Sequence, residues 1–277
     1  MLDFDFADCV SPATLWRPAR IVDPDAWIEH IPFAFWLIGV LRPLSVVELG
    51  TLGGNSFFAF CQAAAQHGVP ARLAAIDTWQ GDEHAGLYGE EVFADVSRYR
   101  DANYPDSARL IRALFDDARP GFAAASIDLL HIDGLHTYDA VRHDFETWCD
   151  AVSNRGVVLF HDIAVRESGF GVWQLWEELS ARYPAFAFSH GHGLGVLGVG
   201  SDMPAALQQL FQLSGSAAET LRTLYHRLGQ SVVDREPELR RLRRRLFQIE
   251  TSRSWKIANM LADSASFFRR SGGHAKS

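Results

Sequence analysis

The chain has 277 residues, of which 48% are hydrophobic and 22% charged, a composition that supports the core of one α/β domain plus an appendage and excludes a disordered chain. Its net charge of −8 hides an acidic body, residues 1–200 with 13 basic and 27 acidic side chains, and a basic tail, residues 201–277 with 13 and 7. The acidic body argues against a nucleic acid as substrate or partner.

In chain order, residues 1–21 carry little signal, and apolar residues near helical spacing predict a helix over 24–41, with a break at Pro32 left open. Strands and helices then alternate, which predicts a parallel, doubly wound α/β sheet. The expected strands are 45–49, 72–77, 108–111, 127–132 and 156–161, and the expected helices are 55–67, 90–100, 138–151 and 172–182. Two late strands, 185–190 and 194–199, form a hairpin, and the pattern after about 203 is helical. The expected parts are therefore an N-terminal segment (1–21), a main domain (22–200) and a basic helical extension (201–277).

The cellular compartment can be predicted from what the chain lacks. No apolar run reaches the roughly 20 residues that a bilayer-spanning helix needs, and residues 1–8 carry three Asp and no basic residue, unlike a signal peptide. The cysteines Cys9, Cys61 and Cys149 match neither a zinc spacing nor a disulfide framework. We therefore expect a protein of the reducing cytoplasm.

A glycine-rich turn, residues 48–56, follows the first strand. Glycine has no Cβ, so the backbone here can come close to a nucleotide-like ligand. The turn lacks the Lys-Ser/Thr pair of a phosphate loop, and Glu48 would repel a pyrophosphate, so a cationic or hydroxyl-rich ligand such as S-adenosylmethionine (SAM) fits better. Asp77 ends the second strand, where an acid can accept the hydrogen bonds of a ribose diol. Two surface carboxylates beside a plain turn are the alternative.

Polar side chains also follow two later strands. Asp133 and His136 come after the strand 127–132, and His161 and Asp162 come at the end of the strand 156–161. Because the carboxyl ends of parallel strands meet at one sheet edge, these side chains are expected to form a divalent metal site. We interpret His131 as a packed sheet histidine.

Together these motifs resemble the class I SAM-dependent methyltransferases over about residues 22–200, in the catechol-type, metal-assisted O-methyltransferase form. The later blocks 77–86, 131–138 and 160–163 also resemble a bacterial subgroup that methylates surface-polysaccharide and macrolide sugars. The resemblance implies a seven-stranded sheet that ends in an antiparallel hairpin, and transfer of a methyl group from SAM to a sugar hydroxyl of a glycan or glycolipid precursor. Aromatic and acidic residues of 79–89 either hold that sugar or form a structured loop.

Site residues carry over by position. The cofactor-binding set is Glu48, Gly50, Thr51, Gly53, Gly54, Ser56, Asp77, Asp116 and Asp133. The metal ligands are Asp133, His161 and Asp162, with Mg²⁺ as first choice. His136 is the general base, with a supporting or substrate-binding role as the alternative. His161 departs from the acidic or Asp-Asn pair of the family, which leaves a softer metal, or none, open. His143, Asp144 and Glu146 are expected in solvent. Arg166 either serves the site, by orienting Asp162 or binding substrate, or forms a surface ion pair.

Two other functions stay open. One is a metal-dependent enzyme of the same fold with other chemistry, such as hydroxylation or hydrolysis. The other is an assembly protein whose tail, residues 235–277, docks on a glycosyltransferase or on anionic lipid at the inner membrane. Leu239, Leu242, Leu246 and Ile249 suggest a short coiled-coil seam in that tail, and 252–257 resemble a motif of polysaccharide glycosyltransferases. A homo-oligomer is also expected.

Overall fold

The computed structural model describes residues 6–25, 27–82, 86–87 and 89–235, together with Arg241 and Arg245. The chain divides into two compact units, Met1–Val232 and Val233–Ser277. The first unit carries the sheet, the helices on both of its faces and the candidate site.

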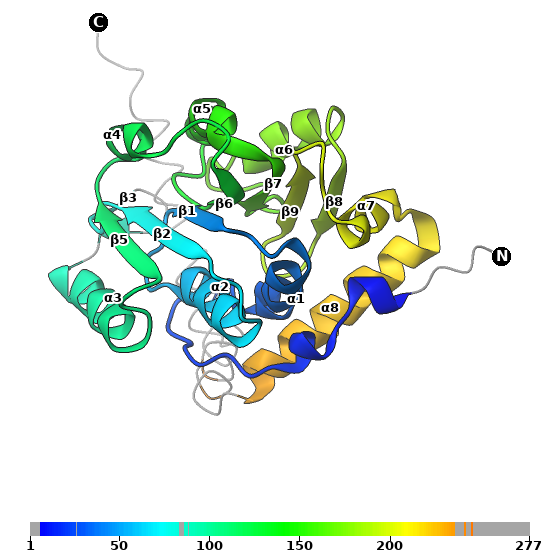
Figure 1. The fold of residues 1–277 in the computed structure, drawn as a ribbon, viewed down its shortest axis with the longest axis horizontal. Coiled ribbons are helices and arrows are strands. Elements are labelled where there is room, and N and C mark those ends of the chain that lie inside the picture. The colour runs from blue at the N-terminus through cyan, green and yellow to red at the C-terminus, as the bar shows by residue number, and fades with distance from the viewer. Residues whose placement is uncertain are drawn as a thin grey trace, which may run out of the picture. The chain divides into compact units, whose positions relative to one another are not determined.

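One seven-stranded sheet has the order β5-β2-β1-β6-β7-β9-β8 (Figure 1). Its strands are β1 (Ser45–Leu49), β2 (Arg72–Asp77), β5 (Ala108–Arg112), β6 (Ile127–Ile132), β7 (Val152–His161), β8 (Ala185–Phe188) and β9 (Leu194–Gly198). The five strands from β5 to β7 in this order are parallel, whereas β9 runs antiparallel to both of its neighbours. The expected doubly wound, mostly parallel seven-stranded sheet that ends in an antiparallel hairpin is therefore confirmed.

Five helices lie in connections between strands: α2 (Asn55–Gln66), α3 (Glu90–Asn103), α4 (Phe115–Ala118), α5 (Tyr138–Trp148) and α6 (Val172–Ser180). Helix α1 (Ile31–Leu41) precedes β1, and α7 (Ala205–Gln212) and α8 (Gly215–Arg235) follow β9. A small hairpin pairs β3 (Gly81–Asp82) with β4 (Gly86–Leu87). Short 3-10 helices cover Phe6–Cys9, Pro12–Leu15, Ile28–His30, Arg119–Gly121 and Cys149–Ala151.

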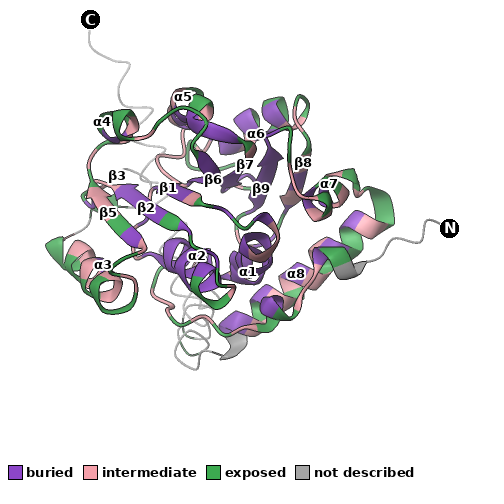
Figure 2. Cartoon of the chain, viewed as in Figure 1, coloured by how far each residue is buried: buried purple, intermediate pink, exposed green. Residues whose placement is uncertain are grey.

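The first helix begins later than the sequence predicts. The prediction placed a helix over 24–41, but α1 begins at Ile31, after a 3-10 turn at Ile28–His30. Pro32 therefore lies in the first turn of α1, where its missing N–H breaks no intrahelical hydrogen bond. Figure 2 shows α1 buried nearly all round, as expected of a helix that is apolar on every side.

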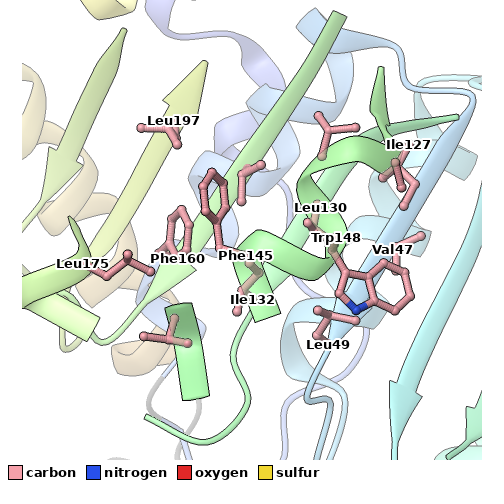
Figure 3. Packing of buried hydrophobic residues seen from close by; sticks show 14 of the residues in the cluster. Val47, Leu49, Ile127, Leu130, Ile132, Phe145, Trp148, Phe160, Leu175 and Leu197 are labelled. Carbon is pink, nitrogen blue, oxygen red and sulfur yellow. The ribbon is translucent and has the colours of Figure 1, made fainter. Parts of the chain in front are cut away.

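The main hydrophobic core lies between the sheet and helices α5 and α6. Phe145 and Trp148 of α5 pack against Leu130 and Phe160 from β6 and β7 (Figure 3). Burial of an aromatic side chain of this size contributes about 1.5–3 kcal/mol. Side chains alternate between the two faces of a strand. Glu48, which precedes Leu49, and His131, which follows Leu130, therefore point to the opposite face, toward α2.

The helices after the sheet belong to the same compact unit. The Tyr225 hydroxyl on α8 donates a hydrogen bond of 2.8 Å to the Cys9 carbonyl, and its ring lies 5.5 Å from that of Phe33. The expected boundary after residue 200 falls inside this unit, because α7 and α8 pack on N-terminal segments that lie far away in sequence. The predicted coiled-coil seam and the 252–257 motif lie outside the described residues. Among the helices that the structure describes, none is long and apolar enough to cross a bilayer.

Candidate active site

A cavity of about 410 Å³ opens at the carboxyl ends of β1, β2, β6 and β7. This edge is where open α/β sheets bind their ligands, and the volume is typical of a small-molecule site. Ten of the predicted site residues line it: Gly50, Thr51, Gly53, Gly54, Ser56, Asp77, Asp133, His136, His161 and Asp162. Glu48 and Asp116 are not among the lining residues.

The glycine turn touches the end of β6 directly. Gly50 has φ +84°, and a Cβ at this position would lie 2.0 Å from the carbonyl oxygen of Asp133. The backbone N–H of Asp133 in turn donates to the Leu49 carbonyl at 2.8 Å. Only glycine permits this close approach, which brings the turn and the catalytic candidates to one cavity.

Asp77 holds the same turn from the side of β2. Its Oδ2 accepts hydrogen bonds from the backbone N–H groups of Thr51 (2.8 Å) and Leu52 (3.0 Å), and its Oδ1 accepts from that of Trp79 (2.7 Å). A carboxylate has about four acceptor sites, two on each oxygen, so Oδ1 can accept one further hydrogen bond, and a single contact with a ribose hydroxyl is compatible with this arrangement.

Glu48 was expected to contact a cofactor, but it does not line the cavity. Its carboxylate is fully buried, where it accepts a hydrogen bond from the Thr51 hydroxyl (3.0 Å) and pairs with Nδ1 of His131 (2.8 Å). Nε2 of His131 accepts from the Trp27 indole N–H at 3.1 Å, so the proton of His131 lies on Nδ1. Glu48 therefore stabilises the glycine turn through its hydrogen bond with Thr51. His131 is the packed, hydrogen-bonded sheet histidine that we predicted.

The acidic residues after β5 also differ from expectation. Asp116 pairs with His143 at 2.9 Å on the exposed surface, while the cavity is lined by its neighbours Leu114 and Phe115. These two apolar side chains offer a face to a flat heterocycle. Their position just after β5, immediately before Asp116 and Asp117, is the sequence feature that indicates them.

Asp144 was expected in solvent and is buried instead. Burial raises the pKa of this carboxyl to about 7, against the opposing effect of the His143 charge. Helix α5 turns Asp144 inward, so that its Oδ2 lies 3.5 Å from where a Cβ on Gly134 would be, beside the cavity floor. His143 and Glu146 are exposed, as expected.

The catalytic candidates form one cluster. Nε2 of His136 lies 2.9 Å from Oδ2 of Asp162 and 3.6 Å from Oδ1 of Asp133. Nδ1 of His161 lies 3.1 Å from Oδ1 of Asp133 and 3.2 Å from Oδ2 of Asp162. The predicted convergence of two carboxylates and two imidazoles at adjacent strand ends is therefore present.

Electrostatics in this cluster favour the ion pairs. Burial opposes the charge on His136, but hydrogen bonds and attraction from Asp133 and Asp162 outweigh it and raise the pKa of His136 to about 9. The same attraction outweighs burial at His161, whose pKa lies well above its usual value, and at Asp133, whose pKa lies well below. Without a cation, the two carboxylates are thus balanced by imidazolium groups.

Two further residues that sequence reasoning missed complete the cluster. Nδ1 of His192 lies 3.5 Å from Oδ1 of Asp162, and the Phe170 ring stacks on His136 with centroids 4.5 Å apart. Asp162 (φ +62°) and His192 (φ +66°) both have left-handed backbone, a strained conformation that concentrates at functional sites. The only sequence signal for His192 was its place between two glycines in the late hairpin.

Two side chains proposed for substrate contact lie elsewhere. Trp79 is 1% exposed, and its indole N–H donates to the Leu52 carbonyl at 3.0 Å, so it supports the glycine turn and cannot stack on a sugar. Arg166 packs over Trp173 at 4.3 Å and pairs with Glu177 at 3.4 Å, which fits the surface ion pair of the two alternatives. Residues 83–85 and 88 of the predicted sugar loop lie outside the described residues.

These residues fit the groups that the resemblance implies. A divalent cation would find Nδ1 of His161 at 3.1 Å from a carboxylate oxygen of Asp133 and 3.2 Å from one of Asp162. Two groups of three side chains have the spacing of metal ligands: Asp133, His136 and Asp162, and His161, Asp162 and His192. SAM would find the glycine-rich turn, Asp77 as a ribose acceptor, and the apolar side chains of Leu114 and Phe115.

Comparisons with known proteins agree with this reading. Residues 47–163 match a family model described as a methyltransferase domain. The chain is 49% identical over 189 residues to an uncharacterized protein, y4gI, of Sinorhizobium fredii (strain NBRC 101917 / NGR234). That match covers 68% of this chain but spans only 21% of the relative, about a fifth of its length.

Solved structures show a weaker likeness. A putative caffeoyl-CoA O-methyltransferase from Staphylococcus aureus is 15% identical, with 64% of this chain and 84% of that chain covered and a TM-score of 0.49. The O-methyltransferase TomG from Streptomyces achromogenes is 17% identical, with 65% and 82% covered and a TM-score of 0.47.

Proposed function

We propose that this protein is a SAM-dependent O-methyltransferase that uses a divalent cation. The observation that supports this most is a single cavity lined both by the glycine turn, with Gly50 and Gly54, and by the cluster of Asp133, His136 and Asp162. The methyltransferase match over residues 47–163 covers both parts of the cavity. Cofactor and acceptor would therefore meet at one sheet edge.

The proposed reaction joins the acceptor oxygen to a methyl carbon. SAM would supply that carbon from its sulfonium, and the sulfur would keep the electron pair of the broken S–C bond. Asp133, Asp162 and His161 would hold a divalent cation, which would orient the acceptor hydroxyl and lower its pKa. His136 would take the hydroxyl proton on Nε2 as the C–O bond forms, which requires that it be neutral and no longer paired with Asp133 and Asp162. Phe170 holds the ring of His136 in place by stacking on it.

For the acceptor we propose a sugar hydroxyl of a glycan or glycolipid precursor. This rests on the resemblance of blocks 131–138 and 160–163 to sugar-modifying methyltransferases, and the buried position of Trp79 lends it no support. The cytoplasmic location, the homo-oligomer and a peripheral contact through residues 235–277 remain predictions.

Calorimetry and mass spectrometry test the proposal. The purified chain should bind SAM, and a saccharide acceptor incubated with both should gain the mass of one CH₂. Absence of SAM binding would end the proposal. Full turnover in the presence of EDTA would remove the cation from it.

One observation favours a second candidate, oxidation chemistry at a metal. His161, Asp162 and His192 form a group of two histidines and one carboxylate, a donor set that open-sited iron oxygenases use. A product that gains one oxygen atom in place of a CH₂ would identify this alternative.

A further inference from the structure

The candidate cation site contains imidazole nitrogens, whereas Mg²⁺ sites are built from oxygen ligands. Nδ1 of His161 lies between the two carboxylates, 3.1 Å from Asp133 and 3.2 Å from Asp162, and the side chain is only 3% exposed. Ligand atoms about 2.0–2.2 Å from a first-row metal lie roughly 3–3.5 Å from one another. The two separations between Nδ1 of His161 and the carboxylate oxygens fall within this range.

The other nitrogen of His161 fixes which atom faces the carboxylates. Its Nε2 donates to the Gly191 carbonyl at 3.1 Å, and that same oxygen accepts from Nε2 of His30 at 3.0 Å. A carbonyl oxygen offers no proton, so Nε2 of His161 must carry one, and Nδ1 remains for the site. Metal-binding histidines typically have this arrangement, in which the second ring N–H donates to a backbone carbonyl and sets the tautomer.

A further nitrogen lies on the far side of Asp162. Nδ1 of His192 is 3.5 Å from Oδ1 of Asp162, and His192 belongs with His161 and Asp162 to a group that has the spacing of metal ligands. His136 is left out of the ligand set because its Nε2 is the proposed proton acceptor. The donor set is then Asp133, Asp162 and His161, with His192 in reach.

From this donor set, and resting on the cation site of the proposed function, we propose that the protein binds a first-row transition metal in preference to Mg²⁺, with Nδ1 of His161 as a ligand. Mg²⁺ favours an octahedral shell of oxygens and sheds water reluctantly. Imidazole nitrogen suits Zn²⁺, Fe²⁺, Co²⁺ and Ni²⁺ far better. The histidine at position 161 thus selects the metal.

Metal competition on the full-length chain tests this without any turnover. The chain is stripped with a chelator, dialysed against equal concentrations of Mg²⁺, Mn²⁺, Co²⁺ and Zn²⁺, and its metal content is measured by mass spectrometry. We expect Co²⁺ or Zn²⁺ at near one equivalent and almost no Mg²⁺. A site filled by Mg²⁺, or a chain that binds none of the four metals, would overturn the proposal.

A variant shows which atom is responsible. His161→Asp replaces nitrogen by oxygen and should weaken Co²⁺ binding by about 10- to 100-fold while improving Mg²⁺ binding. The visible spectrum of bound Co²⁺ should change as well. His143→Gln is the control, because this histidine is exposed and is not among the residues that line the cavity. If His161→Asp does not fold, the wild-type competition still decides.

The two proposals can fail separately. SAM binding by the metal-free chain tests the methyltransferase assignment, whereas the competition tests the metal alone. A chain that binds SAM and takes up Mg²⁺ keeps the first proposal and ends the second.

Discussion

Oδ2 of Asp77 accepts the backbone N–H of Thr51 at 2.8 Å, so the acid that ends β2 holds the turn that ends β1. The same oxygen accepts from Leu52, and Oδ1 accepts from Trp79. One carboxylate thereby orders the turn and lines the cavity beside it. Cofactor affinity should depend on this side chain through both effects.

Asp77→Ala is therefore expected to weaken SAM binding by about 10- to 100-fold, the equivalent of losing one or two charge-assisted hydrogen bonds. Calorimetric titration of SAM into the folded variant measures this. Asp106→Ala is a suitable control, because Asp106 is exposed and is not among the residues that line the cavity. An unchanged dissociation constant for Asp77→Ala would remove Asp77 from the cofactor site.

Gly50→Ala should be far more damaging than the same change at Gly68. Both glycines have positive φ, but a Cβ on Gly50 would meet the Asp133 carbonyl at 2.0 Å, whereas a Cβ on Gly68 meets nothing within 4 Å. We expect Gly68→Ala to cost about 1–2 kcal/mol of unfolding free energy from backbone strain alone. Gly50→Ala adds a backbone clash and should cost about 2–5 kcal/mol, with loss of SAM binding. Urea unfolding of both variants compares them, and equal costs would mean that the close approach is absent.

How much of this could be read from the sequence differs between elements. The strands β1, β2 and β6 match their predicted bounds to the residue, because each is an apolar run bounded by polar or glycine residues. The start of β7 was missed, since Ser153, Asn154 and Arg155 break the apolar pattern while still continuing the strand after a register shift.

The site divides in the same way. Parallel strands end at one edge, so topology alone brings Asp133 and Asp162 together. The pairing of Glu48 with His131 could not be predicted, because it requires knowing that β6 pairs with β1 and that both side chains point to the same face of the sheet. His30 meets the Gly191 carbonyl across 161 residues of sequence, a contact that no local pattern encodes.

Glu48 should contribute to stability more than to cofactor binding. Glu48→Gln keeps the shape but weakens the bonds to Thr51 and His131, so the unfolding free energy should fall by about 1–3 kcal/mol. SAM affinity of the folded variant should change less than in Asp77→Ala, because Glu48 is not among the cavity-lining residues. Denaturant unfolding and calorimetry together measure the two effects. A large loss of SAM affinity at unchanged stability would restore Glu48 to the cofactor site.

His136→Gln should lower kcat by about 10²- to 10⁴-fold, the usual contribution of a general base. SAM binding should stay near wild type, whereas the free energy of unfolding should fall, because a neutral Gln replaces the imidazolium that pairs with Asp133 and Asp162. Methyl transfer to a saccharide acceptor under saturating SAM measures kcat, and His143→Gln provides the exposed-histidine control. If His136→Gln retains full kcat, another group accepts the proton.

Asp144 makes stability fall as pH rises. Burial raises its pKa from an ordinary 3.8 to about 7 in the folded chain, so the folded state binds this proton more tightly than the unfolded state does. The stabilisation is complete below the unfolded pKa and is lost as pH rises through the folded pKa. Asp144→Asn removes the charge, so its gain in unfolding free energy over wild type should grow between about pH 4 and 7 and level off above, at about 2–4 kcal/mol. Asp139→Asn, on the exposed side of the same helix, should show no such trend. Urea unfolding of the three proteins at a series of pH values measures the difference, and a pH-independent gap would mean that Asp144 is ionised in the fold at little cost.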